Sequence, residues 1–239
     1  MVQWLRSHAD PKEAPAMADL TLCVANKAYS SWSLRGWLAL KMTGAAFDEV
    51  VIPMRQADTR VEILKYSPSG LMPALIDGEV VVWESLAIIE YLAEKFPDAG
   101  LWPTDAAARA HARAAASEMH GGFVALRRAM PMNMRRTFPD ARIDDDVGAE
   151  VNRIQAIWRD ARRRFAGASG EGPFLMGAFS AIDAMFAPVA SRFTSYPVDL
   201  ESQAQAYVDA VAAHPPMVEW REAARAEPWV IAEYEDGGT

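Results

Sequence analysis

The stretch at residues 67–85 constrains the fold most, because it joins a turn, a hairpin and the start of a helix (SPSGLMPALIDGEVVVWES). It opens with a Ser-Pro-Ser-Gly turn, in which proline presets φ and glycine accepts backbone conformations that other residues avoid. Pro73 then begins a short apolar run, a position where a strand tolerates a residue without an N–H group. Asp77-Gly78 separates this run from a second one, which predicts a β-hairpin.

A helix is predicted directly after the hairpin. Apolar residues recur at helical spacing across residues 86–96, and Ser85 is interpreted as the N-cap. A hairpin edge next to a helix N-terminus offers backbone groups to an extended ligand and N–H donors to an anion. The alternative is an ordinary ββα unit without a ligand, and the local pattern leaves both interpretations open.

The chain before this stretch alternates between strands and helices. Strands are predicted at 20–26 and 47–54, separated by a helix whose apolar face begins at Leu34 and which ends at Gly44. A short helix is expected at 58–66. A strand, a helix and a second strand in this order predict a right-handed βαβ crossover. With the hairpin and the last helix the order becomes βαβαββα, which predicts an α/β domain.

The pattern changes at residue 98, and we find no convincing strand beyond it. The expected helical segments are 105–129, disturbed at Gly121-Gly122, then 144–165, 181–193, 199–213 and 217–226. Ser180 and Asp183 resemble a capping box at the start of one of them. The sequence therefore predicts an all-helical second part. We divide the chain into an N-terminal extension (1–18), an α/β domain (19–97), a linker (98–104) and an all-helical domain (105–239).

The composition argues against several classes of protein. The 239 residues include 24 Lys and Arg against 32 Asp and Glu, and a net charge of −8 argues against nucleic acid or an anionic membrane as main partner. No apolar run approaches the ~18 residues that a membrane span needs. Residues 1–16 lack the apolar region of a signal peptide, so a cytoplasmic location is expected. The single cysteine, Cys23, lies in an apolar run and is expected to be buried and inert.

Four motifs follow one another along the chain. Ser-Ser-Trp-Ser-Leu-Arg occupies 30–35, a Ser-Pro-Ser-Gly-Leu-Met loop leads into Pro73, Glu84-Ser85 precedes Ala-Ile-Ile-Glu-Tyr-Leu, and the cap spans 180–183. Together they resemble the cytosolic glutathione S-transferase family, over about residues 20–229. The serine loop is similar to that of its zeta class, the maleylacetoacetate isomerase relatives. Trp32 stands where that class has a cysteine, which argues against isomerase activity and against the cysteine-based classes.

The resemblance implies a thioredoxin-like N-terminal domain that binds glutathione as co-substrate, without a metal. The expected glutathione-binding residues are Trp32, Met72, Pro73, Glu84 and Ser85, and a cis Met72–Pro73 bond is implied. The Met72 backbone would pair with the cysteinyl unit of the tripeptide. Ser85 and the first N–H groups of its helix would hold the γ-glutamyl carboxylate, and Glu84 would face the amine. The alternative for Glu84 is a solvated acid in the first turn of the helix.

The serine loop is the expected place of thiol activation. A free thiol titrates near pH ~8.5, so only a few per cent of it is thiolate at neutral pH. A serine hydroxyl can donate a hydrogen bond to the sulfur, and helix N–H groups stabilise its negative charge. Family spacings leave Ser30 and Ser31 as alternative donors, with Ser33 as the expected N-cap. A third interpretation is that all three serines only cap the helix.

The site for the glycyl carboxylate of glutathione stays open. Arg55, Gln56 and Arg60 are the nearby candidates, and the sequence does not choose among them. His111 and His120 lack the spacing of metal ligands, and we interpret both as surface or structural residues.

The main hypothesis is a serine-type glutathione transferase that directs the thiolate at a small hydrophobic electrophile, as in detoxification. One alternative is glutathione-dependent cis–trans isomerisation, which the double serine motivates, and another is a non-catalytic binding module of the same fold. The resemblance also implies a homodimer through helix 85–96 and the helix after Asp105. The electrophile is expected between the two domains, in an apolar pocket. Its expected lining, for which core packing is the alternative, is Phe123, Met130, Met132, Met134 and Trp229.

Overall fold

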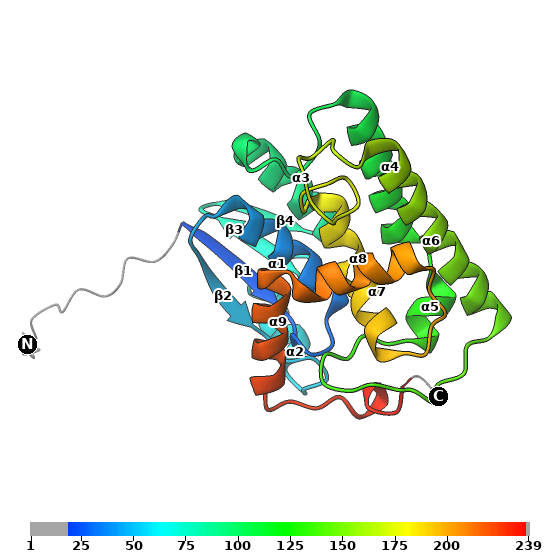
Figure 1. Cartoon of the computed structure of the whole chain (residues 1–239). Coiled ribbons are helices and arrows are strands. Elements are labelled where there is room, and N and C mark those ends of the chain that lie inside the picture. Colours follow the sequence, from blue (N-terminus) through cyan, green and yellow to red (C-terminus); the bar gives the residue numbers. More distant parts are fainter. Residues whose placement is uncertain (1–18, 238–239) are drawn as a thin grey trace, which may run out of the picture.

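The structure is a computed structural model that describes residues 19–237. The predicted N-terminal extension at 1–18 lies outside the described residues. The N-terminal part is an α/β layer that consists of a four-stranded sheet and its helices. A helical part follows it in the chain, as predicted (Figure 1). No helix in residues 19–237 has both the length and the apolar character to cross a membrane.

The sheet consists of four strands: β1 (Leu20–Val24), β2 (Phe47–Val51), β3 (Ala74–Asp77) and β4 (Val80–Trp83). Their order is β2–β1–β3–β4, with β1 and β2 parallel and the other pairs antiparallel. Leu20 lies opposite Phe47 on one side and opposite Asp77 on the other. The hairpin turns at Gly78, whose φ of 57° lies in the region that favours glycine. Cys23 in the central strand is fully buried, as predicted, and burial raises the pKa of its thiol to about 12.

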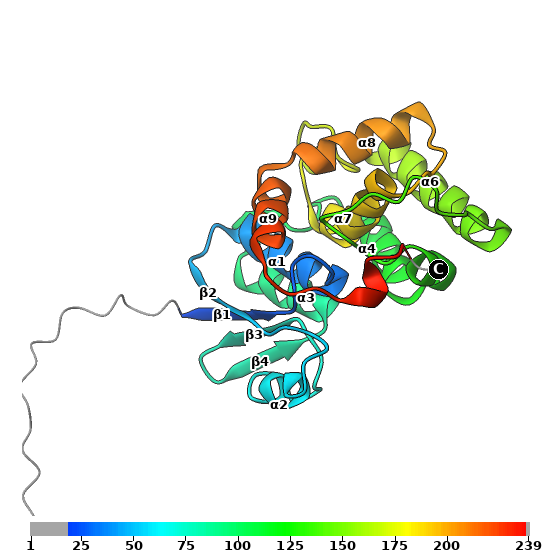
Figure 2. The same cartoon turned by 90° about the horizontal axis from the view of Figure 1, so that it is seen from below.

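Three helices belong to the α/β layer: α1 (Ser31–Thr43), α2 (Thr59–Leu64) and α3 (Ser85–Lys95). Figure 2 shows α1 and α3 on one face of the sheet and α2 on the other. Because α1 packs against β1 and α3 on one side and against the helical part on the other, Leu34, Trp37 and Leu38 are buried. The helix ends at Gly44, which has φ 70° and donates to Lys41 O at 3.2 Å, as expected of a C-cap glycine.

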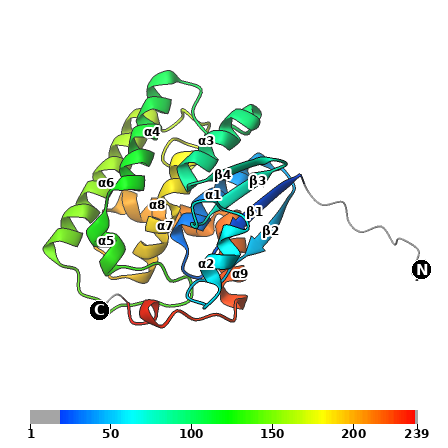
Figure 3. The same cartoon turned by 180° about the vertical axis from the view of Figure 1, so that it is seen from behind.

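The helical part consists of α4 (Ala106–Gly121), α5 (Val124–Ala129), α6 (Asp145–Phe165), α7 (Ala181–Ser195), α8 (Ser202–Ala213) and α9 (Pro215–Ala226). Short 3₁₀ helices at Pro97–Ala99 and Ala232–Tyr234 flank it. Figure 3 shows α4 and α6 side by side, with α5 near one end of the pair. Up to residue 237 this part contains no strand and only two isolated bridges, as predicted.

The predicted helix 105–129 is interrupted at its Gly-Gly pair. Gly122 is extended and donates to Glu118 O at 2.9 Å, which ends α4. A Cβ atom at Gly122 would lie 2.8 Å from that oxygen, so only glycine fits here without movement. Phe123 follows with φ 59°, and the chain then turns into α5. The disturbance expected at this point is therefore a complete break between two helices.

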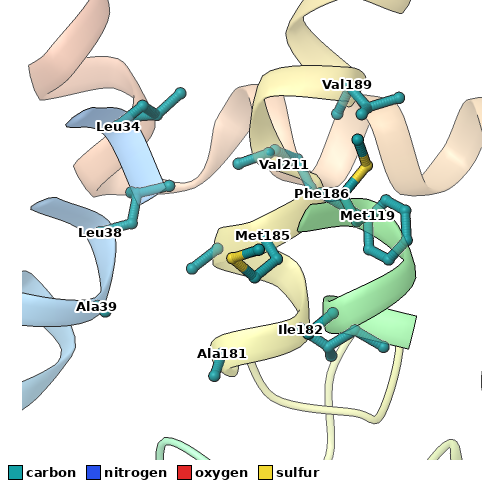
Figure 4. Close-up of a cluster of buried hydrophobic side chains, with 14 of the residues drawn as sticks. Leu34, Leu38, Ala39, Met119, Ala181, Ile182, Met185, Phe186, Val189 and Val211 are labelled. Atoms are coloured by element: carbon teal, nitrogen blue, oxygen red, sulfur yellow. The ribbon is translucent and has the colours of Figure 1, made fainter. Parts of the chain in front are cut away.

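The centre of the molecule is α7, in which every residue except Thr194 is buried. It packs between α1, α4 and α8. Figure 4 shows its side chains Ile182, Met185 and Phe186 together with Leu38 of α1 and Met119 of α4. The α/β layer and the helical part therefore share one apolar core, and α1 holds the serine loop against it.

The predicted capping box starts α7. The N–H group and the hydroxyl of Ser180 both donate to Asp183 Oδ2, each at 2.9 Å. Leu175 N–H donates to the other carboxylate oxygen at 3.0 Å. Burial raises the pKa of Asp183 to about 6. The carboxyl group thus links the loop before α7 to the first turn of the central helix.

Candidate active site

Ser30 is the N-cap of α1. Its Oγ accepts a hydrogen bond from Ser33 N–H at 3.3 Å, and its hydroxyl donates to Ser33 Oγ at 2.8 Å. Ser33 Oγ also accepts from Ala25 N–H at 3.0 Å. The expectation that Ser33 is the N-cap is therefore wrong. Ser33 lies inside the helix, and its hydroxyl oxygen is the acceptor for the Ala25 N–H group directly after β1.

Ser31 is the first residue of α1 and lies beside Ser30 on the wall of one cavity. Its N–H donates to Tyr29 O at 3.1 Å, whereas its hydroxyl makes no hydrogen bond within the described residues. Both serines are 7 % exposed. Of the two alternative donors, only Ser31 thus has a hydroxyl hydrogen that no protein group occupies.

Trp32 is fixed between two cations. The Arg35 guanidinium carbon lies 4.5 Å from the centre of the indole ring, and that of Arg127 lies 4.8 Å from it. The edge of His120 meets the ring with centres 5.1 Å apart. Arg35 itself has no exposed surface and donates through Nε to Met185 O at 3.0 Å. The residue in place of the zeta-class cysteine therefore anchors α1 to the helical part.

The Met72–Pro73 bond is cis, as the resemblance implies. Pro73 is buried next to α1, and a Cβ atom at Gly36 would lie 3.3 Å from Pro73 Cγ. The backbone N–H and C=O of Met72 make no hydrogen bond within the described residues. These two groups stand just before the first residue of β3, Ala74, and are free to pair with an extended ligand.

Glu84, not Ser85, is the N-cap of α3, so the predicted cap is wrong by one position. Glu84 C=O accepts from Ile88 N–H at 2.9 Å, and the residue has φ 72°, a conformation that costs a non-glycine residue about 1–3 kcal/mol. Ser85 is the first helical residue and is fully buried, and its hydroxyl has no partner. The helix N-terminus thus carries a buried hydroxyl whose hydrogen-bonding capacity is unused.

His120 was interpreted from the sequence as a surface or structural residue. The structure places its Nε2 atom 3.6 Å from Glu84 Oε2, in addition to its contact with Trp32. Burial lowers the pKa of His120, and the nearby cations Arg35 and Arg127 lower it further, whereas Glu84 raises it. No sequence spacing links α4 to the Glu84 loop, so only the packing of the two parts reveals this contact.

The three candidates for the glycyl carboxylate remain open. All three are exposed: Arg55 and Gln56 lie on the segment between β2 and α2, and Arg60 lies in the first turn of α2. Gln56 Nε2 donates to Met54 O at 3.3 Å, and the Arg60 guanidinium lies against Gly70. No contact within the described residues selects one of them.

The cavity beside the serine loop has a volume of about 510 Å³. Of the five residues expected to line it, only Met132 does so. Phe123 and Met130 are buried in the core, and Met134 lines a separate cavity. Residues that the sequence did not suggest complete the wall: Tyr29, Met54, Arg127, Arg128, Pro131, Arg192, Glu233 and Tyr234. The expectation of an apolar pocket is thus wrong, because three arginines line it.

The segment after α9 closes one side of this cavity. Glu235 accepts from Tyr29 Oη at 2.7 Å, from Asn133 Nδ2 at 3.0 Å and from Arg136 Nε at 2.6 Å. Glu227 contacts the loop between β1 and α1. Its carboxylate accepts from the N–H groups of residues 27 and 28 at 2.7 and 3.2 Å. Two carboxylates near the end of the chain thus hold the loop that leads to Ser30.

Within residues 19–237, no group of three His, Cys, Asp or Glu side chains could hold a metal ion.

Comparison with known proteins agrees with the arrangement. Residues 29–95 match the family model of the glutathione S-transferase N-terminal domain. A zeta-class glutathione S-transferase of Euphorbia esula is 39% identical over 77 residues, which are 32% of this chain and 34% of that protein. A probable maleylacetoacetate isomerase of Caenorhabditis elegans is 41% identical over 85 residues, 35% of this chain and 38% of that protein. The chain thus aligns with little more than a third of the length of these relatives.

Solved structures match over most of the chain. A glutathione transferase homolog from Burkholderia, with bound glutathione, has a TM-score of 0.66 at 19% identity and covers 87% of this chain and 99% of that one. A theta-class glutathione S-transferase from Xanthomonas axonopodis pv. citri, with glutathione bound, gives 0.59 at 20% identity, with 88% and 99% covered. The fold is that of the glutathione S-transferases. Within this fold, residues 29–95 match the family's N-terminal domain, and the aligned relatives include zeta-class proteins.

Proposed function

We propose that the protein is a glutathione transferase that binds glutathione as co-substrate and activates its thiol with Ser31. The free Ser31 hydroxyl, on the wall of the cavity and at the first turn of α1, carries this proposal. A donor that already serves Ser33, as Ser30 does, would have to give up that bond before it could serve a sulfur atom. Ser30 is therefore assigned to the cap and Ser31 to the thiol.

The activation needs only a modest free energy. A site that favours the thiolate by about 1.4–2.7 kcal/mol lowers the thiol pKa by about one to two units. One hydrogen bond to a charged acceptor contributes about 1.5–3 kcal/mol, and the N-terminus of α1 adds a favourable dipole. The Ser31 hydroxyl and the helix together are thus sufficient.

The remaining parts of glutathione are assigned to the two loops at the start of α3 and before β3. The free N–H and C=O groups of Met72 pair with the cysteinyl unit, with cis-Pro73 directing them. The unpartnered Ser85 hydroxyl and the first N–H groups of α3 hold the γ-glutamyl carboxylate. Glu84 faces the amine, and Trp32 forms the wall beside the tripeptide. One of Arg55, Gln56 and Arg60 takes the glycyl carboxylate.

In the proposed reaction the thiolate sulfur forms a bond to an electrophilic carbon atom, and the leaving group departs with its electron pair. The thiol proton passes to solvent when the thiolate forms. Detoxification of small electrophiles would be the corresponding role.

A second candidate function is glutathione-dependent cis–trans isomerisation. Relatives that carry the name maleylacetoacetate isomerase, in Caenorhabditis elegans and Rhizobium meliloti, are 41% and 42% identical to this chain over 85 and 87 residues. In such a reaction the thiol adds to a conjugated double bond and leaves again after rotation. Trp32 in place of the zeta-class cysteine makes this the second candidate.

The experiment that tests the proposal is retention on immobilised glutathione, followed by a conjugation assay with a generic aryl halide. We expect retention, elution by free glutathione, and turnover that needs Ser31. Retention with isomerisation of a cis-enone acid but without aryl conjugation would favour the second candidate. Retention without either reaction would identify a binding module, and no retention would contradict every glutathione-based reading.

We propose a homodimer with α3 and α4 at the interface. Val80 and Trp83 on the edge strand β4, directly before α3, are 46 % and 42 % exposed, which supports an apolar contact there. Light scattering of the purified protein would give twice the mass of the chain. A monomer at micromolar concentration would contradict the proposal.

We also propose a cytoplasmic location and the boundaries 19–97 and 105–239 for the two domains, joined by 98–104. The shared core around α7 supports domains that unfold together rather than separately. Fractionation of cells and limited proteolysis test these two proposals.

A further inference from the structure

Three arginines line the cavity beside Ser31. Arg127 and Arg128 lie on α5, and Arg192 lies on α7. Arg35 stands behind Trp32, fully buried, and both of its terminal nitrogens lack a hydrogen-bond partner. The whole chain has a net charge of −8, so the positive charge around this cavity is opposite in sign to the net charge of the protein.

None of these arginines forms an ion pair with a carboxylate in the described part of the chain. Arg192 is 4 % exposed and donates to Met130 O at 2.6 Å and to Pro188 O at 3.1 Å, both backbone acceptors. Arg127 likewise donates to backbone oxygens, among them Gly122 O at 3.0 Å. Their positive charge is thus held in place but not neutralised.

The acids nearby do not supply the missing charge. Burial lowers the pKa of Arg127, and Glu150 only partly opposes this; the Glu150 carboxylate accepts from the N–H groups of Ala125 and Leu126 at 3.3 and 2.7 Å. Glu233 also lines the cavity, and no ion pair joins it to the arginines. Burial and Arg127 lower the pKa of Arg192 to about 10, so its guanidinium remains protonated at neutral pH.

Buried charges without counter-charges are unfavourable, and an incoming anion would relieve this. Arg128 is exposed at the cavity and has no partner within residues 19–237, so it is available to an anion at no loss of an existing contact. Tyr29, Met132 and Tyr234 add apolar surface to the same wall. The cavity thus combines an apolar surface with a cationic one.

We propose that the second substrate is an electrophile that carries a carboxylate, with its apolar body against Tyr29, Met132 and Tyr234 and its carboxylate on Arg128 and Arg192. This inference rests on the proposed function and adds a carboxylate to the small hydrophobic electrophile expected from the sequence. The arginines of the cavity lie outside residues 29–95, so the match to the N-terminal domain does not imply it. The carboxylate takes no part in bond formation. The thiolate sulfur bonds to the electrophilic carbon, and the leaving group departs with its electron pair.

The test compares a chlorodinitrobenzoate with its methyl ester, each rate being divided by the uncatalysed rate with glutathione. Both compounds lose chloride to the same sulfur atom and differ in one negative charge. We expect the acid to have the higher normalised kcat/KM, by about tenfold, the size of one charge-assisted hydrogen bond. Added salt should reduce this preference, because Arg128 is exposed.

Arg128→Gln should lower kcat/KM for the acid about three- to fivefold and leave the ester unchanged, the range for an exposed ion pair. Arg128→Lys should restore most of the loss. The matched control is Arg142→Gln, which removes an exposed arginine that lines none of the cavities described above and should change neither rate. An ester used as well as the acid, or an acid rate insensitive to Arg128→Gln, would overturn the inference.

A binding measurement separates this inference from the proposed function. Calorimetry with a dinitrobenzoate and its methyl ester, neither of which has a leaving group, is carried out in the presence of glutathione. If the acid binds more tightly than the ester and Arg128→Gln weakens this preference, the anion site is supported. This holds even if neither chloro compound is turned over. In that case only the transferase proposal fails. Equal binding of acid and ester overturns the anion site whatever the enzyme activity.

Discussion

The Ser30 hydroxyl donates its hydrogen to Ser33 Oγ over 2.8 Å. This bond occupies the hydrogen that a thiolate would otherwise receive and gives Ser30 a structural role at the start of α1. The adjacent hydroxyl of Ser31 makes no hydrogen bond within the described residues. Two neighbouring serines of the same cavity thus differ in what they can offer a ligand.

Ser30→Ala is expected to lower the free energy of unfolding by about 0.5–2 kcal/mol, the usual effect of removing an N-cap side chain. The loss follows because Ser33 N–H then has no acceptor. Chemical denaturation measures the loss, and the pH dependence of conjugation should stay nearly unchanged. An unfolding free energy equal to that of the wild type would mean that Ser30 does not cap α1.

Ser85→Ala is expected to weaken glutathione binding about tenfold, with little change in stability. The Ser85 hydroxyl is buried without a partner, so its removal leaves no protein group unsatisfied and deletes only a donor to the carboxylate. Calorimetric titration with glutathione gives the affinity. Ser202→Ala, at the exposed first position of α8, is the matched control and should change neither quantity. Unchanged affinity in Ser85→Ala would remove this residue from the glutathione site.

Gly122→Ala is expected to destabilise the fold by about 1–3 kcal/mol, because its Cβ atom would lie 2.8 Å from Glu118 O. Gly148→Ala provides the contrast. That glycine lies inside α6 with no heavy atom within 4 Å of a Cβ, so alanine should stabilise by about 0.5–1 kcal/mol. Thermal unfolding of the two variants measures both effects. Equal shifts of the same sign would contradict the break described between α4 and α5.

His120 makes stability depend on pH in a definite direction. Its pKa is lowered in the folded protein, chiefly by burial, so the folded state binds the proton less tightly than the unfolded state does. The stabilising contribution of the neutral form is therefore present above pH ~6.5 and is lost as the pH falls through the lowered pKa. His120→Gln should reduce the fall in melting temperature between neutral and mildly acidic pH. A steeper fall in the variant would reverse the assigned direction.

Most of the fold could be predicted because its signals are local. Asp-Gly marks the hairpin, Gly44 ends α1, and Ser180 with Asp183 starts α7, each through contacts between residues close in sequence. The N-caps predicted at Ser33 and Ser85 are wrong, because the local sequence does not decide which residue caps a helix. Several residues near each helix start can cap, and the choice depends on tertiary contacts such as Ala25 N–H to Ser33 Oγ.

Only those parts of the candidate site that lie within one continuous sequence motif could be predicted. The serine loop, the cis-proline loop and the Glu84-Ser85 pair are each continuous in sequence, and the structure brings α1 next to the cis-proline. The cationic cavity wall was missed, because it joins α5, α7 and the segment after α9 through packing alone. An arginine on an amphipathic helix gives no sign of whether it faces solvent or a substrate.

The central claim is that Ser31 donates the hydrogen bond that stabilises the thiolate. Ultraviolet difference absorbance during a pH titration of the glutathione complex measures the pKa of the bound thiol directly. Wild type should show a pKa about one to two units below that of free glutathione, and Ser31→Ala should return most of this shift while Ser30→Ala keeps it. A bound thiol with the same lowered pKa in Ser31→Ala, or a shift lost only in Ser30→Ala, would contradict the account.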